Sequence, residues 1–154
     1  MNRALVLACG NSQRGDDGVA LQIVNYLREV WCDPTTEFHS QQQWTPELAE
    51  RFSNVETVIF VDAALGKPPG SIACRRLQPR PRTSLDTTHH TSPEYLLLLA
   101  QELYGKHPER AYLVTVAGVE FELGETLSEP VRGAISRTGE RIKALLSEFP
   151  ENPA

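Results

Sequence analysis

Short, continuous apolar runs alternate along this chain with longer segments whose apolar residues recur every three or four positions, and this alternation most constrains the fold. The runs at residues 3–9, 57–61 and 111–116 are dominated by aliphatic and small side chains, as expected for strands buried on both faces of a sheet. A weaker strand-like segment spans residues 36–40. These runs predict a sheet that is covered on both sides.

The segments between the runs predict helices, since their apolar residues fall on one face at helical spacing. The first helix follows Asp16, which we expect to be its N-cap. The other three open with a polar residue followed within two positions by proline, a pattern typical of a first helical turn. They begin at Thr45-Pro46, Ser92-Pro93 and Ser128-Glu129-Pro130, and the last runs for about five turns to Phe149.

Strands separated by helix-length connections favour an α/β fold with a mostly parallel, twisted sheet. We expect about five strands with helices on both faces, a three-layer sandwich, in which residues 71–77 add one antiparallel edge strand. No linker-like segment divides the 154 residues, so residues 1–154 are predicted to form a single domain.

Composition excludes several functional classes. Twenty acidic and fifteen basic residues give a formal charge of −5, which argues against a nucleic-acid partner. No apolar run approaches the roughly 18 residues of a membrane span, and the N-terminus lacks the pattern of a signal peptide. The three cysteines, Cys9, Cys32 and Cys74, form no CxxC pair and fit a reducing compartment. We therefore expect a cytoplasmic protein without a membrane or nucleic-acid partner.

Acidic and imidazole side chains follow the predicted strands, where ligands of such sheets gather. They are Asp16-Asp17 after the first strand, Asp62 at the tip of the third and His89-His90 before the third helix. Two carboxylates and an imidazole suit a borderline divalent ion and leave coordination positions open for substrate or water. Asp17, in the first turn of a helix, is favoured in its ionised form by the helix dipole.

Other roles remain open for each of these residues. Asp16 could be only a helix cap, Asp17 a solvated acid, Asp62 a turn former, and the histidines loop or capping residues. The same acids also suggest a phosphoacceptor receiver module, with Asp62 as acceptor. However, the lysine that such a module needs after its last strand is missing from residues 116–120. A protein-binding α/β domain without catalysis would leave the converging acids unexplained.

The motifs also resemble, in order, those of the hydrogenase maturation endopeptidases. Residues 10–19, GNSQRGDDGV, are similar to the family's opening GNxxxxD[DE]G signature. Residues 60–63 (FVDA) look like its strand-end aspartate, residues 88–93 (THHTSP) like its histidine motif, and residues 121–128 (FELGETLS) like its closing glycine and Leu-Ser segment. The resemblance spans nearly the whole chain.

This resemblance implies an endopeptidase that removes the C-terminal extension from the precursor of a nickel-iron hydrogenase large subunit after nickel insertion. It implies that Asp17, Asp62 and His89 form both the metal-contacting and the catalytic set, with nickel supplied by the precursor. Asp17 stands where many members have glutamate, and His90 could replace or orient His89. Asp16 would be a cap or a general base. No cysteine or serine nucleophile is implied, and we expect a monomer.

Overall fold

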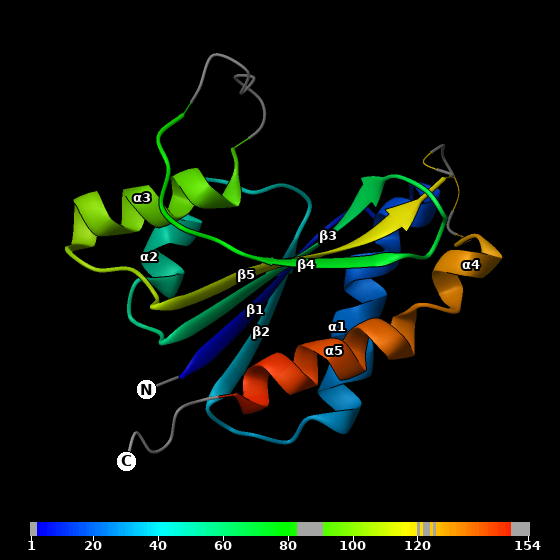
Figure 1. Cartoon of the computed structure of the whole chain (residues 1–154), viewed down its shortest axis with the longest axis horizontal. Coiled ribbons are helices and arrows are strands. Elements are labelled where there is room, and N and C mark those ends of the chain that lie inside the picture. Colours follow the sequence, from blue (N-terminus) through cyan, green and yellow to red (C-terminus); the bar gives the residue numbers. More distant parts are fainter. Residues whose placement is uncertain (1–2, 83–90, 120, 122–123, 125, 149–154) are drawn as a thin grey trace.

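The computed structural model describes residues 3–82, 91–119, 121, 124 and 126–148, which form a five-stranded sheet with helices on both faces (Figure 1). The strand order is β2-β1-β3-β5-β4. The strands are β1 (Ala4–Cys9), β2 (Thr36–Gln41), β3 (Thr57–Leu65), β4 (Ile72–Arg76) and β5 (Arg110–Gly118). All neighbouring pairs are parallel except β4 with β5, so the predicted α/β sheet with one antiparallel edge strand is confirmed.

Two hydrophobic cores make the three layers. One core packs α1 (Val19–Val30) and α5 (Ile135–Ser147) against one face of the sheet. The other packs α2 (Leu48–Phe52) and α3 (Pro93–Tyr104) against the opposite face. Alternate residues of β1 serve the two cores: Ala4, Val6 and Ala8 face the first, whereas Leu5 and Leu7 face the second. A strand that feeds two cores must be apolar at every position, which explains its continuous run.

The start and end of α3 follow local sequence signals. The Ser92 hydroxyl accepts a hydrogen bond from the Tyr95 N–H at 3.1 Å, and Pro93 lies in the first turn. The helix ends at Gly105, whose φ of 79° is readily adopted only by glycine. These features explain why this helix is predicted with its correct boundaries.

Two predicted elements differ from the structure. Asp62 was expected to end its strand, but β3 continues through Asp62 to Leu65 because β5 offers a partner for each residue, from Asp62↔Thr115 to Leu65↔Gly118. The single last helix is instead two: α4 (Glu129–Arg132) and α5 are separated by a turn at residues 133–134. Its predicted end at Phe149 lies outside the described residues.

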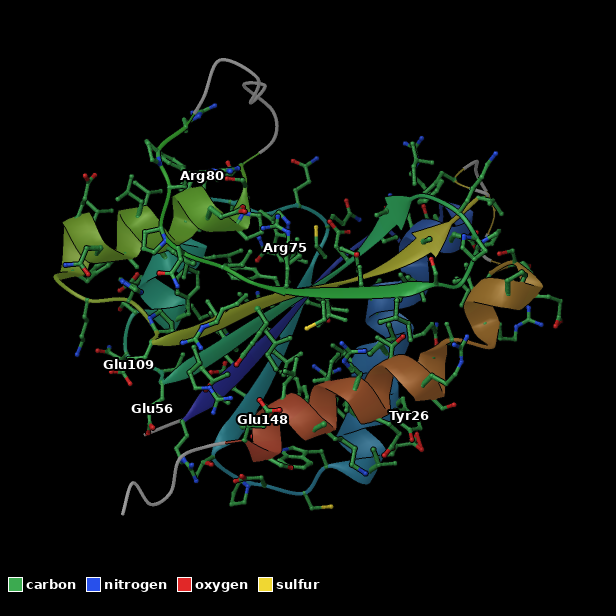
Figure 2. All side chains as sticks on the ribbon, in the orientation of Figure 1. Tyr26, Glu56, Arg75, Arg80, Glu109 and Glu148 are labelled. Carbon is green, nitrogen blue, oxygen red and sulfur yellow. The ribbon has the colours of Figure 1, made fainter. Side chains whose placement is uncertain are left out.

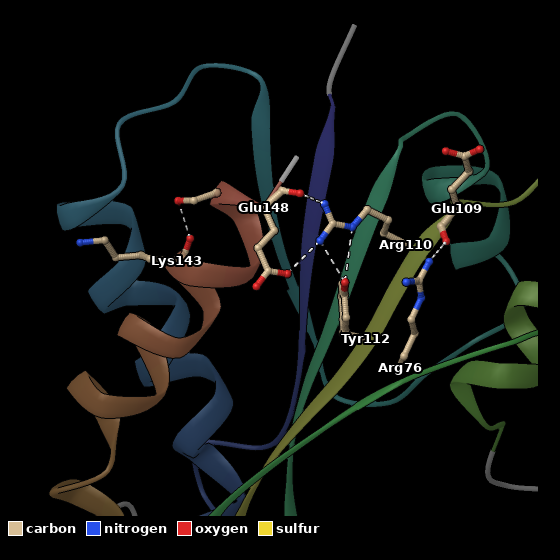
Figure 3. Close-up of polar contacts among 7 residues, drawn as sticks. Arg76, Glu109, Arg110, Tyr112, Lys143 and Glu148 are labelled. Atoms are coloured by element: carbon tan, nitrogen blue, oxygen red, sulfur yellow. Dashed lines mark hydrogen bonds and ion pairs between the residues drawn. The ribbon is translucent and has the colours of Figure 1, made fainter. Parts of the chain in front are cut away.

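At the end of the sheet opposite to the strand tips, Arg110 fastens α5 to β5 (Figure 3). Its guanidinium donates to the Glu148 backbone carbonyl, lies 3.0 Å from the Glu148 carboxylate and donates to the Tyr112 hydroxyl at 3.1 Å. Among the described helices, none is both long and apolar enough to cross a membrane.

Candidate active site

A cavity of about 430 Å³ opens where β1 and β3 approach their carboxyl ends. Its walls come from the end of β1, the loop and 3₁₀ helix that follow β1, the loop after β2, the middle of β3, the residue before the Ser92 cap of α3 and the segment after β5. The lining residues are Cys9, Asn11, Arg14, Asp17, Gln42, Gln43, Trp44, Asp62, Ala63, Thr91 and Phe121. The cavity thus brings together two of the three predicted site residues, Asp17 and Asp62, at the expected edge of the sheet.

Asp17 lies in the 3₁₀ helix η1 (Gly15–Gly18) and is held from the loop before it. The Asn11 N–H donates to Asp17 Oδ2 at 2.9 Å. A Cβ at Gly10 would lie 2.1 Å from the Asp17 carbonyl oxygen, so only glycine permits this approach. Partial burial raises the pKa of the Asp17 carboxyl, while the Asn11 N–H and the nearby Arg14 charge act in the opposite direction.

Asp62 projects from within β3, and a hydrogen bond from the next residue orients it. The Ala63 N–H donates to Asp62 Oδ1 at 2.8 Å. Burial raises the pKa of Asp62 to about 7; the Ala63 N–H lowers it, and the negative charge of Asp17 raises it. Near neutral pH this carboxyl is therefore close to its point of ionisation, which is suited to binding a cation or exchanging a proton with water.

Cys9 lines the same cavity but is unsuited to nucleophilic attack. Burial, followed by the charges of Asp62 and Asp17, raises the pKa of its thiol. The thiol donates to the Gln42 carbonyl oxygen at 3.3 Å. Because the nucleophile in cysteine chemistry is the thiolate, the protonated Cys9 agrees with the expectation that no cysteine acts here.

The third predicted residue, His89, lies outside the described residues, as does His90. Thr91, the first described residue after them, lines the cavity. Within the described part of the chain, no group of three or more His, Cys, Asp or Glu side chains could hold a metal ion. The roles of His89 as a ligand and of His90 beside it stay predictions.

Asp16 has a different role from either one expected for it. It does not cap α1, whose N-cap is Gly18 without a side-chain hydrogen bond. Its carboxylate is completely buried, and it accepts from the Val119 N–H at 2.9 Å, the Ser128 N–H at 2.7 Å and the Ser128 hydroxyl at 2.9 Å. A buried carboxylate with these partners joins η1 to the segments after β5 and before α4, and it is not placed to act as a base on substrate.

Several lining residues were not predicted, although two lie within the GNSQRGDDGV motif. Asn11 orients Asp17, and the exposed Arg14 donates through Nε to the Phe121 carbonyl oxygen at 3.5 Å. Trp44 packs edge-on against Phe60 of the second core, with ring centroids 5.2 Å apart. Gln42 to Trp44 follow the end of β2, so the rule that ligands gather beyond strand ends could have singled them out.

Comparison with solved structures shows which proteins have a similar fold. Hydrogenase maturating endopeptidase HybD from E. coli has 24% identity and a TM-score of 0.75, covering 95% of this chain and 93% of its own. The [NiFe] hydrogenase maturation protease HycI from Thermococcus kodakarensis has 20% identity and a TM-score of 0.76, covering 96% and 94%. A hydrogenase 2 maturation peptidase from a Thaumarchaeota archaeon has 25% identity and a TM-score of 0.73, covering 96% and 100%.

The chain has the fold of the hydrogenase maturation endopeptidases. This likeness extends over nearly the whole chain, and it confirms at the level of fold the resemblance found in the motifs. A scan against family models and a search of curated proteins found no match. The antiparallel β4 also separates this fold from the receiver alternative, whose doubly wound sheet is parallel.

Proposed function

We propose that this chain is an endopeptidase that removes the C-terminal extension of a nickel-iron hydrogenase large-subunit precursor after nickel insertion. The observation that carries the proposal is the pair of carboxylates, Asp17 and Asp62, at one cavity of a hydrogenase-maturation-endopeptidase fold. The substrate would be the precursor protein with its bound nickel. The three free cysteines of this chain are consistent with action in the reducing cytoplasm.

The carboxylate pair suits recognition of a cation that arrives with the substrate. The negative charge of Asp17 helps to raise the pKa of the half-buried Asp62, so a divalent ion that neutralises both carboxylates is favoured there. In our proposal Asp17 and Asp62, with His89, complete the coordination of the precursor's nickel and so place the scissile peptide beside the ion. A bound divalent ion can polarise a peptide carbonyl or activate water.

Orientation of the pair is the contribution of the protein itself. The Asn11 and Ala63 N–H groups each fix one carboxylate oxygen, at 2.9 Å and 2.8 Å. The cavity also holds the protonated Cys9 and the exposed Arg14, neither of which needs to react. Because the pKa of Asp62 is about 7, its carboxyl readily gives up its proton near neutral pH, as coordination of the precursor's nickel would require.

The test compares a nickel-loaded precursor with a nickel-free one. We expect the wild-type chain to shorten only the loaded precursor, and Asp17→Asn, Asp62→Asn or His89→Ala to lower the cleavage rate by at least about 100-fold. Asp33→Asn is the matched control: Asp33 bonds Thr35 in the turn before β2, and its loss should leave cleavage unchanged.

Equal cleavage of both precursors, or of neither, would contradict the nickel-dependent proposal. Full activity in any one of the three variants removes that residue from the set. Circular dichroism of each variant distinguishes loss of a reacting group from loss of the fold.

A further inference from the structure

Two exposed arginines share a buried glutamate on the same face of the sheet as Asp62. Arg75 of β4 donates through Nη1 to Glu94 Oε2 at 2.8 Å, and Arg80 Nη2 lies 3.9 Å from the same oxygen. The Glu94 side chain is 7% exposed, whereas those of Arg75 and Arg80 are 58% and 60% exposed. The three groups leave one net positive charge at the surface of an acidic protein.

A backbone hydrogen bond, in addition to the side-chain contacts, holds Arg80 beside Glu94. Arg80 donates its N–H to the Glu94 carbonyl oxygen at 3.1 Å, which holds the segment after β4 against the first turn of α3. Figure 2 shows Arg75 and Arg80 on the α3 side of the sheet. We call Arg75 and Arg80 the arginine rim.

Sheet register relates the rim to the cavity. Asp62, Thr115 and Ala73 form one row across β3, β5 and β4, and Phe60, Leu113 and Arg75 form the next row on the same face. Two strand spacings and one two-residue repeat separate Asp62 from Arg75, or about 12 Å. Thr91, which lines the cavity, lies only three residues before Glu94.

We propose that the arginine rim binds a carboxylate of the peptide substrate about three to five residues from the scissile bond, an inference that rests on the proposed function. An extended peptide advances about 3.3 Å per residue, so about four residues bridge Asp62 and the rim. The carboxylate is either an Asp or Glu side chain or the terminal carboxylate of a short extension.

Charge arrangement supports this assignment. The pair of Asp17 and Asp62 repels an anionic segment and attracts a cation, whereas the rim does the reverse. The guanidinium group of arginine presents several N–H donors in one plane. Arg75 uses Nη1 to bind Glu94, which leaves the exposed edge of its guanidinium available for a second carboxylate. A substrate with a cation and a carboxylate at this separation would therefore be held in one direction.

The experiment measures KM and kcat for cleavage of the nickel-loaded precursor by wild type and by the double variant Arg75→Gln/Arg80→Gln. The double variant removes both positive charges of the rim, while the amide of glutamine can still donate an N–H to the Glu94 carboxylate, so that this buried group keeps a hydrogen-bond donor. We expect KM to rise about 3- to 10-fold with kcat within about twofold. Arg51→Gln, which breaks the surface ion pair with Glu37, is the matched control and should leave KM unchanged.

Substrate variants identify the source of the carboxylate. In one arm, Asp and Glu within five residues of the cleaved bond are changed to Asn and Gln; in the other, the terminal carboxylate is converted to an amide. One arm should raise KM for wild type by the same factor and have no added effect on the double variant. Additive effects of the two changes overturn the inference.

A binding measurement separates this inference from the proposed function. Immobilised precursor should bind the double variant about 3- to 10-fold more weakly than wild type, whether or not cleavage follows. Equal binding and equal KM overturn the rim as a binding site, as does a fall in kcat alone. Rim-dependent binding without cleavage by wild type would instead contradict the proposed protease activity.

Discussion

At the scale of single residues, Asp62 combines burial with an ionisable group. The β3 residues before it, 57–61, are completely buried, and the strand continues beyond it to Leu65, so the carboxyl cannot turn out fully into water. Burial is accordingly the largest cause of the raised pKa. Ionisation of such a group destabilises the folded chain, and a cation bound beside it offsets this effect.

The raised pKa of Asp62 predicts a loss of stability with rising pH. Below pH 4 the carboxyl is protonated in both the folded and the unfolded chain, so its contribution to the free energy of unfolding is fully present. This contribution is lost as the pH rises through about 7, the pKa in the folded chain. Asp62→Asn lacks this loss and should be more stable than wild type at pH 8 by about 2–4 kcal/mol, with little difference near pH 4. Urea unfolding of both proteins between pH 4 and 8 measures this difference, and parallel curves would contradict it.

Asp16, unlike Asp62, is a buried acid whose removal should destabilise the fold. Removing its carboxylate leaves the N–H groups of Val119 and Ser128 without their acceptor, so Asp16→Ala should lower the free energy of unfolding by about 3 kcal/mol. Ser128→Ala removes the hydrogen bond from the Ser128 hydroxyl to Asp16 and should lower the free energy of unfolding by about 1 kcal/mol. Urea unfolding measures both, and an unchanged Asp16→Ala protein would disprove the structural role.

At the scale of elements, contact between α1 and α5 depends on a glycine within a helix. Gly139 lies in α5, and a Cβ there would be 2.4 Å from Cδ2 of Tyr26 in α1. The Tyr26 hydroxyl donates to the Glu140 carboxylate at 2.6 Å, so the ring is held against the helix. Close packing at this point outweighs the lower helix propensity of glycine.

Gly139→Ala is therefore expected to destabilise the protein although alanine favours helices. The clash with Tyr26 should lower the free energy of unfolding by about 1–3 kcal/mol. Gly133→Ala is the matched control: its nearest atom would be 3.5 Å away and its φ is −67°, so it should be neutral or slightly stabilising. Thermal unfolding compares the two, and equal effects would contradict the packing argument.

The elements also show where local patterns suffice. The capped start of α3 and the apolar run of β1 were predicted because their signals lie within a few residues. The extension of β3 depends on hydrogen bonds to β5, more than 50 residues away along the chain. Local sequence does not contain that partner, so the strand was predicted too short.

At the scale of the whole molecule, the two ends of the sheet have different roles. The cavity lies toward the carboxyl ends of β1 and β3, whereas the Arg110–Glu148 ion pair holds α5 to β5 at the opposite end of the sheet (Figure 3). Among the described residues, the exposed large apolar side chains are Val30 of α1, Leu103 and Tyr104 of α3, and Leu65 and Val119. The last two line one shallow hollow beside the ends of β3 and β5. They are 83% and 47% exposed.

This distribution predicts a monomer in the absence of substrate. The described surface has few large apolar side chains to bury between copies, and the net charge of −5 opposes self-association. Light scattering after gel filtration at micromolar concentration should give a mass near 17.2 kDa. A stable dimer would contradict the prediction, and Leu65→Ser would then test whether the hollow forms its interface.

The sequence alone determined the alternation of strands and helices, the α/β class and the positions of Asp16, Asp17 and Asp62 after apolar runs, because each depends on a short-range pattern. Tertiary structure decided the surroundings of these acids. Asp16 became a buried structural group through contacts with Val119 and Ser128, 103 and 112 residues away. Asp62 acquired its raised pKa from the layers packed around it, since burial is a property of the assembled sheet and helices.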